Sequence, residues 1–348
     1  MFCGLLKGYA SVPPNFYLFV NKSCNYKCLM CDFSKKSGGY FRDNIGEELS
    51  LQNWKDFIDS VEKYKPSIFF PAPEPFLYRD FMALVSYIKE KGLFCSIATN
   101  GSLLNKYAQD LVDLGLDTLE LSCDGASDVH DKIRGIPGAF SNLTKTMINI
   151  QKIKGNSEKP QLNTAFTITH LNYDRINETL DVLDSLGVKM NLTVSHLTYM
   201  PTELIAEHNK SNNLIKISTH TQGYLEICKN IDTKVLLDQL TAAKNRKFNN
   251  IKNLFISPDL DLKGLYDWYN SPADLNINSY CFFPWLTGLI NFNGNIILSP
   301  VCGPVFGNII QQSFTSIWNS REFRNVRLMV SKDKKYPACF SCCSARTF

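Results

Sequence analysis

Apolar and polar positions in residues 15–200 follow two periods that alternate along the chain. Short apolar runs are typical of buried strands, and apolar residues spaced three or four apart are typical of helices packed on one face. Leu51–Tyr64 has the second pattern, with Trp54 and Ile58 on one face. The predicted strands are Phe16–Asn21, Ser67–Pro71, Phe94–Thr99, Thr118–Cys123, Gln161–Ile168 and Lys189–His196.

A segment with the helical period follows these strands in turn, as in Leu51–Tyr64 and Leu77–Lys91. Strands that alternate with helices imply parallel pairing through right-handed crossovers. A closed barrel would need two more repeats than the sequence shows. We therefore predict an α/β fold, a partial (β/α)6 TIM-like barrel, with reactive groups at the C-terminal ends of the strands.

The pattern changes outside this region, which predicts four parts. Residues 1–14 form an N-terminal segment, 15–200 the barrel, 201–280 a helical connector and 281–348 a small C-terminal domain of a β-hairpin and a helix. Two apolar runs around Asn293-Gly294 predict the hairpin, since this dipeptide suits a tight turn. The helix is expected over Phe314–Val330.

Composition narrows the class of protein. The chain has 348 residues, is 44% hydrophobic and has a net charge of +4 from scattered basic residues, which argues against nucleic acid as a partner. Met1–Pro14 lacks the features of a signal peptide, and no apolar run is long enough for a membrane span. The twelve cysteines then fit metal ligands in a reducing cytoplasm better than disulfides.

Three cysteines, Cys24, Cys28 and Cys31, follow the first predicted strand. Thiolates are soft ligands that suit iron–sulfur clusters and zinc. Zinc in a structural site usually has four protein ligands. Three from one loop indicate either a distant fourth ligand or a position left open, and a structural zinc loop is the alternative.

The C-x3-C-x2-C pattern in this place resembles the cluster loop of the radical S-adenosylmethionine (SAM) superfamily. The resemblance implies that Cys24, Cys28 and Cys31 bind three irons of a [4Fe–4S] cluster and that SAM binds the fourth. It implies further that Met30 contacts SAM, and that an electron from the cluster cleaves SAM to a 5′-deoxyadenosyl radical, which abstracts hydrogen from a substrate.

Two motifs at the next strand ends are similar to SAM-binding motifs of this family. Pro71–Pro75 resembles the Gly-Gly-Glu-Pro motif, which implies that Glu74 contacts the SAM amino group; a proline-rich turn is the alternative. Ala72-Pro73 replaces the two glycines, so the loop must run differently or use only carbonyl acceptors. Thr99 and Asn100 match a Thr-Asn-Gly near the SAM pocket.

The fourth predicted strand leads into Ser122-Cys123-Asp124-Gly125 and then His130–Gly135. This stretch resembles the S-x-D-G and H-D-x-x-R-G sequences of maturase-type members. The resemblance places Ser122, Asp124 and Arg134 in the SAM site, with the arginine fork suited to a carboxylate. We expect His130 to fix the loop and not to act as a general base.

The last two predicted strands supply weaker candidates. Asn163 and Thr167 share the interior face of the fifth strand and could bond the ribose hydroxyls, although threonine is an ordinary strand residue. The resemblance places backbone contacts to adenine at His196 and Leu197, and His196 could instead face substrate.

The C-terminal cysteines resemble those of the SPASM/twitch extension, which binds an auxiliary iron–sulfur cluster. The resemblance implies one auxiliary [4Fe–4S] cluster, for electron transfer, on four ligands; a four-cysteine zinc site is the alternative. Cys343 is a spare cysteine that could replace Cys342 as the fourth ligand. The four ligands that the resemblance implies are Cys281, Cys302, Cys339 and Cys342.

We expect an oxidoreductase or epimerase that acts on a small molecule, at a carbon of a sugar or aminocyclitol. The first alternative is a peptide-modifying maturase of the natural-product (RiPP) or sulfatase type; about fifteen residues before the first strand are too few for a leader-binding domain. The second is a non-catalytic structural zinc protein. The resemblance implies an electron donor such as flavodoxin or ferredoxin.

An epimerase needs a thiol that returns hydrogen to the substrate. Cys123 is the candidate for this catalytic role, and Cys95 is a poorer one. For both residues a buried core cysteine is the alternative, because cysteine behaves as a small apolar side chain.

Overall fold

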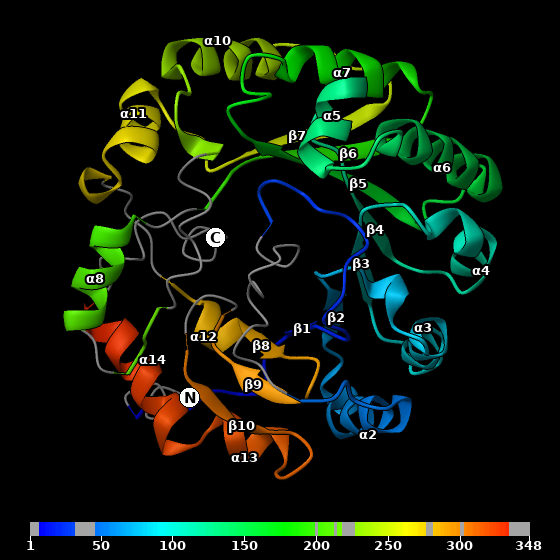
Figure 1. Cartoon of the computed structure of the whole chain (residues 1–348). Helices are drawn as coiled ribbons and strands as arrows, with labels where there is room; N and C mark the ends of the chain where they lie inside the picture. Colours follow the sequence, from blue (N-terminus) through cyan, green and yellow to red (C-terminus); the bar gives the residue numbers. More distant parts are fainter. Residues whose placement is uncertain are drawn as a thin grey trace.

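The computed structural model describes residues 7–31, 46–198, 201–211, 214–217, 227–275, 281–299 and 303–333. They form one curved sheet with helices around its outer face (Figure 1). The sheet has ten strands in the order β10-β9-β8-β1-β2-β3-β4-β5-β6-β7. None of the helices in these ranges is long and apolar enough to cross a membrane.

The six predicted strands are confirmed, and each pairs in parallel with the next. This is the partial barrel expected from the alternation of the sequence. The strands are β1 (Asn15–Leu18), β2 (Ser67–Phe70), β3 (Cys95–Thr99), β4 (Thr118–Ser122), β5 (Gln161–Ile168), β6 (Met190–His196), β7 (Ile251–Ser257), β8 (Thr287–Ile290), β9 (Asn295–Ile297) and β10 (Val305–Asn308).

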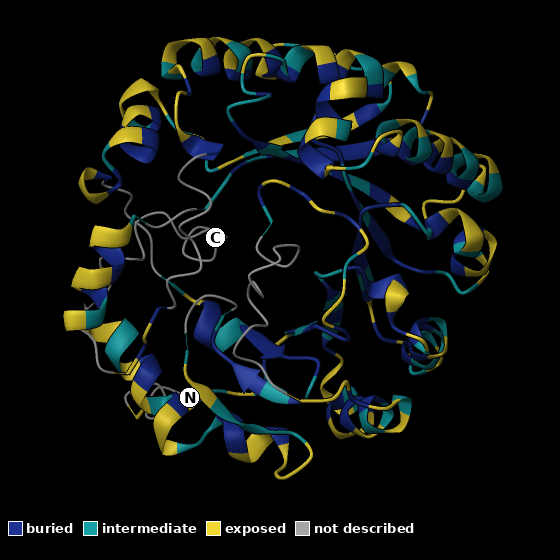
Figure 2. Cartoon of the chain, viewed as in Figure 1, coloured by how far each residue is buried: buried dark blue, intermediate teal, exposed yellow. Residues whose placement is uncertain are grey.

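The helices bury the faces that they turn to the sheet and expose their outer faces (Figure 2), and most of their buried residues are apolar. Trp54 and Ile58 of α2, for example, are fully buried in the main core. The helices are α2 (Leu51–Val61), α3 (Phe81–Glu90), α4 (Ala108–Asp113), α5 (Ser127–Arg134), α6 (Ala139–Lys154), α7 (Ile176–Ser185), α8 (Thr202–Ser211), α10 (Thr233–Lys244), α11 (Leu262–Asn270), α12 (Phe283–Leu286), α13 (Phe314–Trp318) and α14 (Arg321–Asp333).

The connector expected to be helical over residues 201–280 also contains β7, a seventh parallel strand paired with β6. Leu254 and Ile256 of β7 pack against the core, whereas Phe255 is 54% exposed. An apolar residue on the exposed face breaks the alternation that marks a half-buried strand. The predicted barrel of six parallel strands therefore lacks a seventh, β7, which the structure contains.

The predicted hairpin is confirmed as β8 and β9, joined by a turn in which Gly294 has φ +86°. Its first strand also pairs in parallel with β1, from Asn15 opposite Thr287 to Leu18 opposite Ile290. The C-terminal region therefore extends the barrel sheet beyond β1.

The single helix expected over Phe314–Val330 is divided into α13 and α14. Asn319, at the break, exchanges two hydrogen bonds with the backbone of Ala10. Arg327 is fully buried, lies over the ring of Trp318 and donates to the carbonyl of Gly8 at 3.0 Å. These bonds hold the segment before β1 against the C-terminal helices.

From β3 to β7 most side chains on the concave face of the sheet are polar. Side chains of alternate residues point into the barrel, and an amide row crosses three strands, because Asn253 donates to Asn191 and Asn191 donates to Asn163. Among the described strands this face carries no lysine or arginine at these positions. The polar members from β3 to β7 are Ser96, Thr118, Glu120, Ser122, Gln161, Asn163, Thr167, Asn191, Thr193, Ser195, Asn253 and Ser257.

Candidate functional site

The cysteine loop leaves β1 and crosses to α5 (Figure 1). The Leu29 amide donates to the Ile133 carbonyl at 2.8 Å. Gly135, at the end of α5, has φ +70°, and a Cβ atom there would lie 2.7 Å from the Lys27 carbonyl oxygen. A residue without Cβ therefore lets the loop pack on the end of α5.

The three cysteine side chains share one apolar cluster with Met30 and Ile133. Burial raises the pKa of the Cys24 and Cys28 thiols. Within the described ranges no three ligand-type side chains already form a metal-binding group. The cysteine loop follows the C-terminal end of β1, and its role in binding a cluster stays a prediction.

Two nitrogen donors point at the cysteine sulfurs. Arg134 Nη1 lies 3.7 Å from Cys28 Sγ, and Asn100 Nδ2 lies 3.9 Å from Cys24 Sγ. Donors of this kind stabilise thiolates and the sulfurs of a bound cluster. The donor set and its surroundings therefore fit an iron–sulfur cluster held by Cys24, Cys28 and Cys31.

Glu74 lies in the loop after β2, which contains a cis Ala72–Pro73 peptide bond, and is fully buried. Its carboxylate accepts from the Thr99 hydroxyl at 2.9 Å and from the Asn100 amide at 3.0 Å. The carboxylate thus joins two of the predicted motifs. Its backbone carbonyl accepts from Asn21 at 2.7 Å, and its backbone amide donates to the Ser23 carbonyl at 3.2 Å, so this loop contacts the start of the cysteine loop through an amide donor as well as a carbonyl acceptor.

Burial raises the pKa of Glu74 to about 7, from the ordinary 4.5, although the Asn100 and Thr99 bonds oppose the shift. Folding therefore takes up a proton between these pH values. We expect the stability of the apo-protein to be complete below pH 4.5 and to fall by on the order of 3 kcal/mol as the pH rises to 7.

The test is denaturant unfolding of the apo-protein across this pH range, for wild type and Glu74→Gln. The variant should lose this part of the pH dependence. Glu207→Gln, on the exposed face of α8, is the matched control and should retain it. An unchanged pH slope in Glu74→Gln would show that Glu74 titrates normally.

Asp124 and Arg134 form a buried ion pair, with Asp124 Oδ2 2.6 Å from Arg134 Nη2. Burial raises the pKa of Asp124, and the guanidinium opposes that shift. The other carboxylate oxygen of Asp124 accepts from the Thr167 amide at 2.9 Å. Arg134 thereby connects the cysteine loop, through Cys28, to the ends of β4 and β5.

His130 on α5 is fully buried, and its Nδ1 accepts from the Asp124 amide at 3.1 Å. Burial lowers the pKa of His130 to about 3, with the Arg134 charge adding to the shift. A neutral histidine that bonds the backbone holds the loop in place, in agreement with the expectation from the sequence.

The remaining interior candidates lie on the concave face. Ser122, at the end of β4, and Thr167, near the end of β5, are both partly exposed there. Asn163 lies deeper and its Oδ1 accepts from Asn191 at 3.0 Å. Asn163 is therefore part of the amide row and lies four residues before Thr167 in β5.

His196 is turned away from the barrel interior. Its Nδ1 lies 2.7 Å from the Tyr269 hydroxyl, and its ring packs at 5.3 Å from that of Trp268, both on α11. The suggestion that the His196 side chain could face substrate is therefore corrected; the strand alternates, and its outward positions pack against helices. Leu197 is partly buried and contacts the cysteine-loop cluster.

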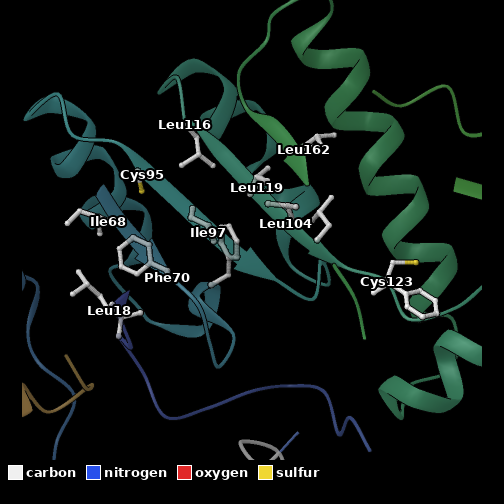
Figure 3. Close-up of a cluster of buried hydrophobic side chains, with 14 of the residues drawn as sticks. Leu18, Ile68, Phe70, Cys95, Ile97, Leu104, Leu116, Leu119, Cys123 and Leu162 are labelled. Atoms are coloured by element: carbon white, nitrogen blue, oxygen red, sulfur yellow. The ribbon is translucent and has the colours of Figure 1, made fainter. Parts of the chain in front are cut away.

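Cys123 and Cys95 both lie in the main apolar core (Figure 3). Cys123 is fully buried, its thiol donates to the Gly125 carbonyl at 3.5 Å, and burial raises its pKa to about 12. This is the buried-core alternative stated above, and the position does not present the thiol to the barrel interior.

Of the predicted auxiliary ligands, Cys281 is partly exposed and packs in one cluster with Phe19 and Ala72, close to the end of β1. The start of the C-terminal region therefore lies near the loop after β2 that contains Ala72. The other predicted ligands and the spare cysteine, Cys302, Cys339, Cys342 and Cys343, lie outside the described residues.

Two asparagines that sequence reasoning missed hold the site together. Asn25, inside the cysteine loop, accepts from Asn100 Nδ2 at 2.9 Å. Asn172 is fully buried and donates to the carbonyls of Asp124 and Thr167. The only signal was a polar residue in a loop after a strand, which is too common to single out a site.

Comparison with known proteins agrees with this geometry. The family model described as the radical SAM superfamily matches residues 18–186, and one described as an iron–sulfur cluster-binding SPASM domain matches residues 281–343. An Fe-coproporphyrin III synthase of Methanosarcina barkeri is 30% identical over 182 residues, 52% of this chain and 43% of that protein. The chain thus spans less than half the length of this relative.

Other similarities extend over nearly the whole chain. A tungsten-containing aldehyde ferredoxin oxidoreductase cofactor-modifying protein of Pyrococcus furiosus is 23% identical over 94% of this chain and 86% of its own. Streptococcus suis SuiB bound to precursor peptide SuiA has a TM-score of 0.67 at 16% identity, covering 98% of this chain and 73% of that one.

The fold, the cysteine loop with its nitrogen donors and the two matched domains agree with one another. SAM and [4Fe–4S] clusters are accordingly the cofactors of this protein. The chain belongs to the radical SAM superfamily and carries a C-terminal SPASM iron–sulfur cluster-binding domain.

Proposed function

We propose that this protein cleaves SAM reductively and uses the resulting 5′-deoxyadenosyl radical to remove hydrogen from a substrate held in the barrel. The observation that carries the proposal is the Arg134 guanidinium, which contacts both Cys28 and Asp124. One cationic residue thereby joins the cluster loop to the strand end predicted to bind SAM. When bound, the cluster and SAM supply the electron and the radical.

The chain's own residues would position these groups. The nitrogen donors of Arg134 and Asn100 would stabilise the sulfur ligands, and the motif residues Met30, Glu74, Thr99, Ser122, Asp124, Thr167, His196 and Leu197 would form or support the SAM pocket. Cys281, with Cys302, Cys339 and Cys342, would hold one auxiliary cluster that accepts an electron from the substrate radical. A low-potential donor such as flavodoxin or ferredoxin would reduce the first cluster.

For the substrate we propose a small polar molecule, oxidised or epimerised at a carbon of a sugar or aminocyclitol. The support is the polar lining of the concave face from β3 to β7, where the amides of Asn163, Asn191 and Asn253 form a row. Hydroxyl and amine groups can bond to such amides. A polyanion would find no lysine or arginine at the inward positions of the described strands.

A peptide is the second candidate, because the same amide row can bond peptide groups. The similarity to SuiB, which was crystallised with its precursor peptide, shows the fold alone. The two candidates are separable with deuterated compounds: transfer of deuterium into 5′-deoxyadenosine from an aminocyclitol, and not from a peptide, would support the first.

The test of the general function is anaerobic reconstitution with iron and sulfide, followed by SAM and dithionite. We expect 5′-deoxyadenosine and methionine to form, and neither to form without dithionite. Bound zinc without acid-labile sulfide would instead support a structural metal protein and would overturn the proposal.

A further inference from the structure

A cavity of about 250 Å³ opens inside the barrel at the end where the first strands begin. It is lined by the first residues of β1 and β2, by Phe94 just before β3, and by Glu120 in the middle of β4. The motif residues of the SAM site follow the opposite, C-terminal ends of these strands. The cavity is therefore a separate place in the fold.

Glu120 is the one charged residue that lines this cavity. Within the described part of the chain no side chain or backbone donor bonds to its carboxylate, and burial raises its pKa. A buried carboxylate is costly unless it is paired with a cation or accepts hydrogen bonds. Glu120 is partly exposed to the cavity, so a cationic group that enters the cavity could supply the partner that the described residues do not.

Aromatic rings form much of the rest of the wall. Tyr17 and Phe69 lie edge to face with ring centroids 5.0 Å apart, and Phe94 is 48% exposed. Aromatic faces attract ammonium and guanidinium groups, and they do so most strongly where water is excluded. Neither lysine, arginine nor histidine lines the cavity to compete for the carboxylate.

The amide row ends beside this carboxylate. Asn163 is the strand neighbour of Glu120, and the Oδ1 of Asn163 is used by Asn191. Its NH2 group, which has no acceptor among the described residues, is left for the side facing Glu120 or a ligand. The NH2 group of Asn163 thus favours the ionised carboxylate of Glu120 at this end of the row. It is also a donor that a ligand in the cavity could use.

We propose that this cavity binds an organic cation, an ammonium or guanidinium group, with Glu120 as its counter-charge and Tyr17, Phe69 and Phe94 as its aromatic wall. The volume is below that of cavities for drug-sized ligands, roughly 300 Å³ and above, so it suits one side-chain-sized group. As the anchor of an amine-bearing substrate the site rests on the proposed function, whereas cation binding itself does not.

The experiment is calorimetric titration of butylammonium chloride into the reconstituted holoenzyme, without SAM or reductant. We expect saturable binding that weakens at least tenfold in Glu120→Gln, and that is at least tenfold stronger than binding of 1-butanol. Glu207→Gln, an exposed substitution of the same kind, is the matched control and should bind as wild type does.

Phe94→Leu keeps the carboxylate but removes one ring, and we expect a severalfold loss of affinity. This variant tests the site even if Glu120→Gln fails to fold. A capped lysine, Nα-acetyl-lysine methylamide, distinguishes the source of the cation: tighter binding than butylammonium indicates a lysyl side chain of a peptide, and weaker binding indicates a free amine.

Equal binding by wild type and Glu120→Gln, or equal binding of butanol and butylammonium, would overturn the proposal. Failure of the two proposals is distinguishable, because SAM cleavage is measured separately. Butylammonium binding without 5′-deoxyadenosine formation would leave the cation site and remove the radical function. Formation of 5′-deoxyadenosine without butylammonium binding would overturn the cation site and leave the radical function.

Discussion

Replacing Cys24, Cys28 and Cys31 together by alanine is expected to abolish the formation of 5′-deoxyadenosine. The triple variant should also retain about four of the roughly eight irons expected from two [4Fe–4S] sites. The physical reason is that three thiolates of one loop hold one cluster, whereas the SPASM ligands lie elsewhere in the chain. Iron, acid-labile sulfide and 5′-deoxyadenosine are measured after anaerobic reconstitution.

Cys95→Ala is the matched control, because Cys95 is fully buried at the start of β3 and belongs to neither set of ligands. It should keep all of the iron and the SAM cleavage, at a modest cost in stability from the lost core contact. A triple variant with as much iron as Cys95→Ala would show that the loop holds no cluster.

Arg134→Met is expected to destabilise the protein by roughly 3–5 kcal/mol, because it leaves the buried carboxylate of Asp124 without its ion-pair partner. Adding Asp124→Asn removes the unpaired charge and keeps an oxygen for the Thr167 amide. The double variant should therefore recover most of the lost stability, as measured by denaturant unfolding of the apo-protein.

The same double variant separates stability from function. If Arg134 also serves the cluster loop and SAM, the stable double variant should still be unable to form 5′-deoxyadenosine. Normal SAM cleavage in it would restrict Arg134 to a structural role. Additive destabilisation by the two substitutions would show that they do not interact, contrary to the short distance between their side chains.

The sequence predicted the strands that bury one face against helices, because there the apolar period is clear. It missed β7, where Phe255 lies on the exposed side, and it did not predict α5. In α5 only Val129 and Ile133 form the apolar stripe, and the rest of the helix is polar. Tertiary contacts, not the local pattern, determine these two elements.

The motifs place the candidate site at the C-terminal ends of the strands but do not predict the bonds within it. Glu74 and Thr99 are 25 residues apart, and only the parallel pairing of β2 with β3 brings them together. The orientation of His196 toward Tyr269 depends on where α11 docks, which no pattern in the strand itself reveals. Spacing thus predicts which loops meet, whereas packing decides which side chains face one another.

The parallel pairing of β8 with β1 has a consequence for how this protein can be divided. A strand with one unpaired edge offers its amides and carbonyls to other chains, which promotes aggregation. Cutting the chain before Cys281 would expose the edge of β1, from Asn15 to Leu18, and would remove the residues that hold the segment before it. The SPASM region therefore covers the edge of β1 in the barrel sheet. We expect that neither region can be replaced by that of another protein without exposing this edge.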